Sequence, residues 1–276
     1  MVAPGIQKQS RKGKMVVICS AKGGVGKTTL AVNLAIALYK KKLQIALMDG
    51  DFQFGDVNVA MDLESSFSIS DVAERMEILD SFSLNNYMYK HTSGVRVLSA
   101  PKRPELADLI TPEIIDKVSQ FILEDYHYLI VDTGVGINDQ TLTLIEKADV
   151  ILLLTTLELI SIKNTKRMLQ ILQTLEMHEK VKVVLNRSTM ESVIQADQVP
   201  QILQIEHLYF IPNNFQVASK SLNLGIPFVI NQPSCDLSKA IFKVAEHLDS
   251  NEPMAMPKKK TILEKMLSAN RQKRRE

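Results

Sequence analysis

The sequence predicts an α/β fold with a mostly parallel, doubly wound sheet and helices on both of its faces. Short apolar runs alternate along the chain with longer segments in which apolar residues recur at helical spacing. Most apolar runs are unbroken, as in strands that are buried on both faces. Hydrophobic residues form 45% of the chain, aromatic residues 5%, and Trp is absent. We therefore expect a core of Ile, Leu, Val, Ala and Met.

The predicted elements follow one another in a regular β-α order. The first strand, at 15–19, runs directly into a glycine-rich turn, and a helical pattern follows at 30–38. Further strands are predicted at 45–48, 95–98, 128–131, 150–154, 181–185 and 208–211. Further helices are predicted at about 70–79, 111–124, 138–147, 158–176, 193–204, 215–223 and 235–249. Thr111 before Pro112 is typical of a helix start.

Charge and proline placement divide the chain into one domain at 15–250, a basic leader at 1–14, a linker at 251–257 and a basic tail at 258–276. The whole chain carries +2, while 1–14 holds four basic and no acidic residues and the tail holds eight basic and two acidic ones. The acidic body disfavours a broad nucleic-acid-binding face, whereas the tail suits anionic lipid, DNA or an acidic partner.

Two further observations exclude classes of protein. The chain has no signal-peptide core and no apolar run long enough to span a bilayer, so we expect a cytoplasmic protein whose membrane contact is peripheral. Its two cysteines, Cys19 and Cys235, form no C-x-x-C pair, which argues against zinc, iron–sulfur or disulfide frameworks.

The turn after the first strand predicts a phosphate loop that binds ATP with Mg²⁺. In SAKGGVGKTT, residues 20–29, backbone N–H groups and a helix terminus would face phosphate oxygens. Lys27 would reach the β- and γ-phosphates, and the Thr28 hydroxyl would ligate Mg²⁺. Ala21 replaces the usual first glycine, and Lys22 follows it. The other predicted nucleotide contacts in the loop are Gly23, Gly24, Val25, Gly26 and Thr29.

Carboxylates follow two of the predicted strands. Asp132 ends the strand at 128–131, and Asp49 and Asp51 follow the strand at 45–48. Phosphoryl transfer needs a carboxylate near the metal and a group that positions the attacking water. Ligands of open α/β sheets bind at the carboxyl ends of the strands, so all three are candidates, although carboxylates also cap the helices that follow strands.

The motifs resemble those of a known superfamily. KGGVGKTT at 22–29 resembles the deviant Walker A motif of the MinD/ParA superfamily of P-loop ATPases, and MDGD at 48–51 resembles its second aspartate motif. The resemblance runs from about residue 15 to 248. Four segments are most similar to the CpaE/TadZ group, localisation ATPases of type IV (Flp/Tad) pilus assembly: 51–57, 98–107, 184–187 and 218–227. The segment 132–137 also resembles the flagellar-placement and MinD branches.

This resemblance implies a role for each site residue. Lys22 would reach across an ATP-dependent homodimer to the partner's phosphates, and with Lys27 and Asp51 it would form the catalytic set. Asp51 would orient the hydrolytic water, and Asp49 and Asp132 would support Mg²⁺ through its waters. The remaining implied contacts, to adenine or beside it, are Asn186, Arg187 and Pro212.

The tail predicts a membrane contact. Lys258, Lys259 and Lys260 precede a short amphipathic segment, and more basic residues follow. Such a segment can lie on an anionic membrane, and a dimer would present two of them. A solvated or core-docked terminal helix is the alternative. The apolar face of the segment consists of Ile262, Leu263, Met266 and Leu267.

The sequence thus predicts a positioning ATPase that cycles on and off membrane or protein partners, in a pilus or other localisation system. A MinD-like ATPase for division-site or flagellar placement, or a ParA-like partition ATPase that binds DNA, is the alternative. A tyrosine autokinase or an iron–sulfur reductase on the same scaffold is disfavoured, because no tyrosine follows Tyr209 and the cysteines are unpaired.

Overall fold

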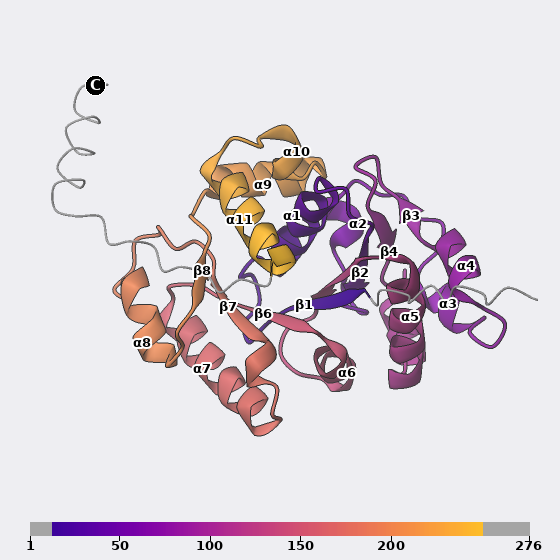
Figure 1. The fold of residues 1–276 in the computed structure, drawn as a ribbon, viewed down its shortest axis with the longest axis horizontal. Helices are drawn as coiled ribbons and strands as arrows, with labels where there is room; N and C mark the ends of the chain where they lie inside the picture. Colours follow the sequence, from indigo (N-terminus) through magenta and orange to yellow (C-terminus); the bar gives the residue numbers. More distant parts are fainter. Residues whose placement is uncertain (1–12, 251–276) are drawn as a thin grey trace, which may run out of the picture.

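The computed structural model describes residues 13–250 and contains one eight-stranded sheet, with the strand order β3-β4-β2-β5-β1-β6-β7-β8 (Figure 1). All neighbouring strands are parallel except β3 and β4, which are antiparallel. The predicted fold class is confirmed. The strands are β1 (Lys14–Ser20), β2 (Ile45–Gly50), β3 (Tyr89–Lys90), β4 (Arg96–Leu98), β5 (Tyr128–Thr133), β6 (Val150–Thr155), β7 (Val181–Leu185) and β8 (Leu208–Phe210).

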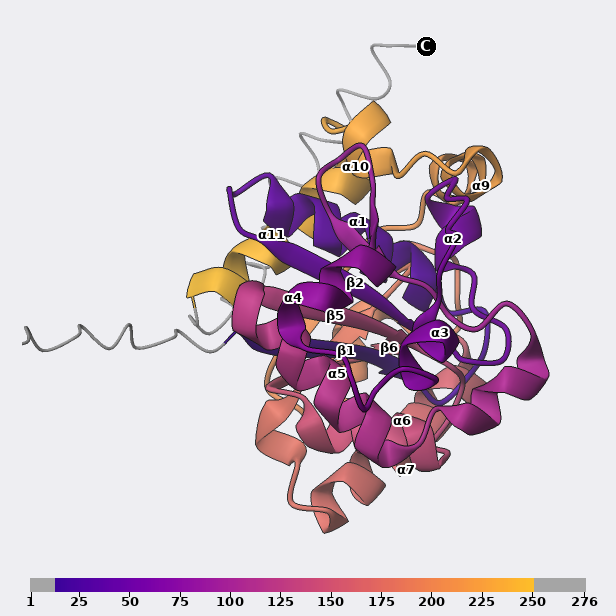
Figure 2. The same ribbon diagram turned by 90° about the vertical axis from the view of Figure 1, so that its right-hand side faces the viewer.

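Helices cover both faces of the sheet, as Figures 1 and 2 show from two directions. One face packs against α1 (Lys27–Tyr39), α10 (Phe228–Asn231) and α11 (Asp236–Ser250), with α2 (Val57–Ala60) and α9 (Phe215–Leu224) near one end. The other face packs against α3 (Ile69–Ala73), α5 (Pro112–Asp125), α6 (Asp139–Lys147) and α7 (Leu159–Thr174), while α8 (Val199–Leu203) joins α7 in a third cluster.

The central strand β1 shows why the apolar runs are unbroken. Val16 and Ile18 lie in the core under α1, whereas Met15, Val17 and Cys19 lie in the core on the opposite face. Successive side chains of a strand point to opposite faces, so a strand covered on both sides must be apolar throughout. Strand β1 is flanked by β5 and β6, which places the turn after it in the middle of the carboxyl edge of the sheet.

Two predicted helices are shorter in the structure than in the prediction. The pattern at 70–79 yields only α3, because the N–H groups of Arg75, Met76 and Ile78 bond to carbonyls three rather than four residues back, so the chain continues as turns after Ala73. The pattern at 193–204 yields α8 and a preceding 3₁₀ turn, because Val193 is fully in solvent and Pro200 fits only the first turn of a helix.

The structure adds short elements that periodicity does not reveal: α2, α10, the two-residue strand β3, α4 (Ser81–Leu84) and four 3₁₀ turns. None of the helices within residues 13–250 is both long enough and apolar enough to cross a bilayer. The predicted linker at 251–257 and the tail with Ile262, Leu263, Met266 and Leu267 lie outside the described residues, as does most of the predicted leader.

Candidate functional site

The glycine-rich turn lies between β1 and α1, as predicted. Gly24 and Gly26 have φ angles of 73° and 100°, in the left-handed region that side chains with a Cβ disfavour. Lys27 and Thr28 form the first turn of α1, and Lys27 is buried. Because Gly26 is the residue before the helix, the free N–H groups of the first helical turn lie next to the loop. This geometry suits a phosphate group.

Two side chains that follow β7 hold the loop from one side. The Asn186 amide donates a hydrogen bond to the Val25 carbonyl at 2.8 Å, and the Arg187 guanidinium donates one to the Gly24 carbonyl at 3.1 Å. A Cβ on Gly26 would lie 2.5 Å from the Asn186 amide nitrogen. The resemblance implies only a role at or beside adenine for Asn186 and Arg187, so their hydrogen bonds to the loop are a further finding.

Thr28 and Asp132 meet below the loop. The Thr28 hydroxyl donates to Asp132 Oδ2 at 2.6 Å, while Asp132 Oδ1 is buried and has no hydrogen-bond partner among the described residues. An unpartnered buried carboxylate oxygen is costly unless water or a cation completes its contacts. Mg²⁺ favours oxygen ligands and keeps several of its waters. The hydroxyl of Thr28 and the free oxygen of Asp132 therefore fit a hydrated Mg²⁺ ion.

Asp49 lies opposite Asp132 in the register of β2 and β5. Its carboxylate accepts hydrogen bonds from the N–H groups of Asp51, at 3.2 Å, and Val57, at 3.1 Å. Asp49 thus also fixes the segment that leads into α2, the capping role that a strand-end carboxylate often has. The Asp51 carboxylate, in turn, accepts from the Phe54 N–H at 3.2 Å. The three predicted carboxylates therefore share one edge of the sheet.

Burial changes the protonation of this cluster. It raises the pKa of Asp132 to about 7, against the lowering effects of the Thr28 hydroxyl and the Lys27 charge. Burial also raises the pKa of Asp49, and the negative charge of Asp132 raises it further. Two carboxylates in a low-dielectric site disfavour each other's ionisation, and a bound divalent cation reverses this. The site is therefore suited to hold positive charge.

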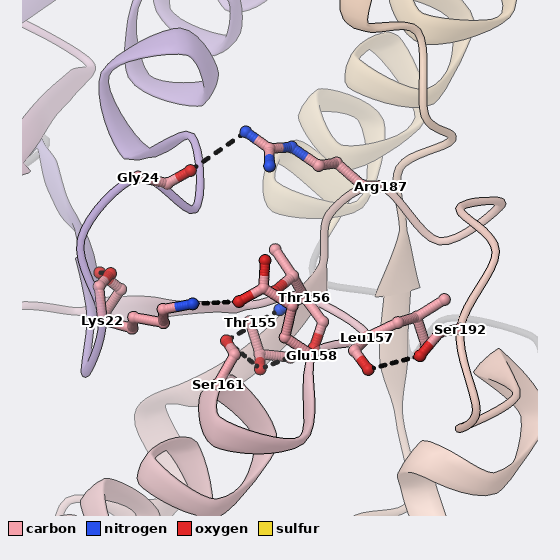
Figure 3. Close-up of polar contacts among 10 residues, drawn as sticks. Lys22, Gly24, Thr155, Thr156, Leu157, Glu158, Ser161, Arg187 and Ser192 are labelled. Atoms are coloured by element: carbon pink, nitrogen blue, oxygen red, sulfur yellow. Dashed lines mark hydrogen bonds and ion pairs between the residues drawn. The ribbon is translucent and has the colours of Figure 1, made fainter.

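Lys22 has a partner within its own chain. Its ammonium group pairs with the carboxylate of Glu158, the residue immediately before α7 (Figure 3). The two side chains are 36% and 42% exposed. The sequence did not identify Glu158, because the two residues lie 136 positions apart and no local pattern links them.

A cavity of about 170 Å³ opens beside the loop. Its walls bring together the residues that the resemblance places around adenine, Asn186, Arg187 and Pro212, with Gly26 and Thr29 of the loop. The sequence does not predict its apolar wall, because those side chains come from four separate helices, α1, α9, α10 and α11: Leu30, Phe215, Leu222, Phe228, Leu237 and Ile241. The structure thus gathers every predicted site residue of 20–212 around one edge of the sheet.

Comparison with known proteins finds relatives along nearly the whole chain. An uncharacterized ATP-binding protein of Methanocaldococcus jannaschii is 29% identical over 247 residues, which cover 89% of this chain and 91% of the relative. The septum site-determining protein MinD of Thermotoga maritima is 26% identical over 227 residues, which cover 79% and 82%. The crystal structure of MinD from Pyrococcus horikoshii, complexed with Mg-ADP, superposes with a TM-score of 0.75 at 21% identity and covers 87% of this chain and 97% of that one.

The family assignment rests on residues 11–249, which match the sequence family ParA, described as "NUBPL iron-transfer P-loop NTPase". This match spans the phosphate loop, the three carboxylates and the cavity. The chain therefore belongs to the ParA family of P-loop NTPases, within the MinD/ParA superfamily of ATPases.

Proposed function

We propose that the protein binds and hydrolyses ATP with Mg²⁺ and that ATP joins two copies of the chain. The observation that carries the hydrolytic part is the Thr28–Asp132 pair beneath the loop, with one carboxylate oxygen left free. Mg²⁺ bound there would neutralise charge on the β- and γ-phosphates. Thr28 would ligate it, and Asp132 and Asp49 would accept hydrogen bonds from its waters.

The other site residues have roles that their places support. Backbone N–H groups of the loop and the Lys27 ammonium would bind the phosphates, and the cavity with Asn186, Arg187 and Pro212 would take the adenine ring. Asp51 would accept a hydrogen bond from the attacking water and orient it toward the γ-phosphorus. These assignments follow the resemblance residue by residue and agree with where the side chains lie.

The surface around the loop supports dimerisation. Four large apolar side chains adjoin the site residues and are strongly exposed: Phe54 at 72%, Val135 at 55%, Leu159 at 56% and Ile160 at 64%. Phe54 lies three residues after Asp51 and donates its backbone N–H to that carboxylate, Val135 lies against Gly23, and Leu159 and Ile160 come directly after Glu158. Exposed apolar groups of this kind mark surfaces that associate. In the proposed dimer, Lys22 of each chain reaches the phosphates bound by the other.

The proposed ATP-dependent dimer predicts a different behaviour for each of three variants. Lys27→Ala should abolish ATP binding, because the variant lacks the ammonium group that supplies the main positive charge facing the phosphates. Lys22→Ala should retain ATP binding but fail to dimerise, and Asp51→Ala should dimerise yet hydrolyse ATP at least about 100-fold more slowly, the usual scale for losing acid–base or positioning help. Isothermal titration with ATP, light scattering with ATP and phosphate release measure binding, dimerisation and hydrolysis in turn. Normal hydrolysis by Asp51→Ala would rule out its water-positioning role.

We further propose that the tail binds anionic membrane. The proposal rests on the basic and apolar residues of 258–276 in the sequence. A single weak tail gains from a second one on the same particle, so membrane binding should depend on ATP.

Deleting 258–276 should therefore leave ATP hydrolysis intact and abolish pelleting with vesicles that contain phosphatidylglycerol. Reversing the charge of Lys258, Lys259 and Lys260 to Glu is the matched test of the electrostatic part, since about 1 kcal/mol is expected from each basic residue near the surface. Pelleting that persists after the deletion would contradict the proposal. ATP-dependent binding to DNA with steep salt dependence would favour the partition function instead.

For the cellular role we propose placement of a type IV (Flp/Tad) pilus assembly system, supported by the four sequence segments similar to the CpaE/TadZ group. The likeness to septum site-determining MinD supports a second candidate, division-site placement. A strain that lacks the gene decides between them. Loss of surface pili with normal septa supports the first, and minicells support the second.

Iron transfer, which the family description names, has little support from the cysteines. Cys19 is buried within β1, and burial raises the pKa of its thiol to about 12. Cys235 bonds to Ser238 at the start of α11. Metal ligation needs thiolates that converge on one point, and these two belong to different parts of the fold.

A further inference from the structure

We propose that Glu158 is a positioning residue that holds Lys22 within its own chain and thereby opposes closure of the dimer. This inference rests on the proposed role of Lys22 in ATP-dependent dimerisation. The contact itself is present in the single chain (Figure 3). A Lys22 ammonium group that pairs with Glu158 must leave it before the same group can bind a partner's phosphates.

The turn that carries Glu158 is fixed by three hydrogen bonds. The Ser161 hydroxyl lies 3.1 Å from the Thr155 hydroxyl and accepts from the Thr156 N–H at 3.1 Å. The Ser192 hydroxyl donates to the Leu157 carbonyl at 2.9 Å. Figure 3 shows these bonds around the turn between β6 and α7. The backbone therefore presents the Glu158 carboxylate to Lys22 in a defined place.

The backbone of Lys22 is also fixed. Its carbonyl accepts a hydrogen bond from the Ser20 hydroxyl at 2.8 Å, and the Arg187 guanidinium binds the Gly24 carbonyl two residues further on. With the loop held on both sides of Lys22, release of its ammonium group needs only a change of side-chain rotamer. Such changes at exposed positions take picoseconds to nanoseconds, so the Lys22–Glu158 ion pair can break and re-form rapidly.

Within residues 13–250, the Glu158 carboxylate has no hydrogen-bond or ion-pair partner other than Lys22. It precedes α7 in the position where a side chain often caps the helix, but its carboxylate makes no capping hydrogen bond. Ser, Thr, Asp or Asn would serve better there. The negative charge of a glutamate at a helix start is stabilised by the helix dipole. Glutamine has the same length but no charge, so Glu158→Gln removes the charge alone. What the charge of Glu158 does in the structure is pair with Lys22.

The charges near the dimer interface predict that removing the negative charge of Glu158 should strengthen the dimer. Glu158 would lie close to phosphates that Lys22 approaches, and like charges repel. A half-exposed ion pair is worth about two- to fivefold in an equilibrium constant. Each dimer releases two such pairs, so removing the charge of Glu158 should tighten the dimer about four- to 25-fold. High salt should reduce this difference because it screens exposed charges.

The first experiment tests the contact without any nucleotide. Wild type, Glu158→Gln, Glu158→Asp and the control Glu206→Gln, an exposed carboxylate, are acetylated briefly with an N-hydroxysuccinimide ester, and mass spectrometry follows Lys22. Glu158→Gln should label Lys22 about two- to fivefold faster than wild type, because a free amine reacts and a paired one is shielded. Glu158→Asp should be intermediate, and Glu206→Gln should match wild type. Equal labelling of Lys22 in Glu158→Gln and wild type would overturn the inference.

The second experiment measures dimerisation by analytical ultracentrifugation with AMPPNP, a non-hydrolysable ATP analogue. Glu158→Gln should dimerise at a lower protein concentration than wild type, and the gap should narrow at high salt. An unchanged or weaker dimer of Glu158→Gln would overturn the inference, because Glu158 would then have no role or would aid closure. Failure of every variant to dimerise would instead overturn the proposed function, and the labelling result alone would then decide whether Glu158 holds Lys22.

Discussion

Replacing Asp132 with Asn should make the nucleotide-free protein more stable and weaken its binding of Mg-ATP. Burial raises the pKa of Asp132 from 3.8 to about 7. Above pH 7 the native state must therefore hold a buried carboxylate that the unfolded chain exposes to water at no cost. Asparagine removes that charge and keeps an oxygen for the Thr28 hydroxyl. The free energy of unfolding should rise by about 1–4 kcal/mol above pH 7.

The pH dependence gives this prediction its sign. Between pH 3.8 and 7 the native state binds more protons at Asp132 than the unfolded state, so the stability of the wild type falls as pH rises through that range. The advantage of Asp132→Asn should therefore be largest at pH 8 and shrink toward pH 4. Urea unfolding at several pH values measures it, with Asp108→Asn, an exposed carboxylate, as control. A destabilised variant at pH 8 would contradict the buried-charge explanation.

The affinity of the same variant for Mg-ATP should fall by about 10- to 100-fold, which is the usual effect of removing a residue that orients the ligands of a metal ion. Mg²⁺ competes with a proton for Asp132, so in the wild type Mg-ATP should bind more tightly as pH rises through 7. Isothermal titration at two pH values checks both points. Unchanged affinity would remove Asp132 from the magnesium site.

Gly26→Ala should disrupt the phosphate loop far more than Gly24→Ala. Both positions have positive φ angles, which cost a residue with a Cβ about 1–2 kcal/mol. Only at Gly26 does the added carbon meet another atom, the Asn186 amide nitrogen at 2.5 Å, whereas nothing lies within 4 Å of a Cβ on Gly24. Gly26→Ala must also displace the Asn186 amide from the Val25 carbonyl. We expect it to cost about 1 kcal/mol more than Gly24→Ala in stability and to abolish ATP binding.

Comparing Gly24→Ala with Gly26→Ala separates the strain of a positive φ angle from the clash of the added Cβ with Asn186. A double variant tests the clash. Asn186→Ala should relieve the clash, so the combination Gly26→Ala with Asn186→Ala should lose less stability than the two single changes together. Urea unfolding gives all three values. Strict additivity would show that the Asn186 contact is not what makes Gly26 necessary.

The sequence can predict those parts of the site whose residues lie close together along the chain or at the ends of neighbouring parallel strands. The phosphate loop is one continuous segment between a strand and a helix, as its sequence predicts, and Asp49 and Asp132 lie together because parallel strands end at a common edge. What sequence could not show depends on distant pairs. Arg187 binds the loop from 163 positions away, and no periodicity encodes that meeting.

The fold shows the same division. Each of the seven longer strands carries an apolar run that is typical of a covered sheet, so the sequence predicts them, and all seven are present within residues 13–250. Helix α3 ends at Ala73 and continues as turns, in which Met76 and Leu79 still pack partly against the core, so the apolar spacing does not reveal where the helix stops. The strand β3 has only two residues and is exposed, so no pattern could reveal it.

The position of β1 has a consequence for the order in which the protein is made. Strand β1 is synthesised before both of its neighbours in the sheet, which begin at Tyr128 and Val150. Pairing over such a distance has to close a long loop first, which slows folding. The phosphate loop can therefore take its final shape only after β5 and β6 have been synthesised, and ATP can assist folding only from that point on.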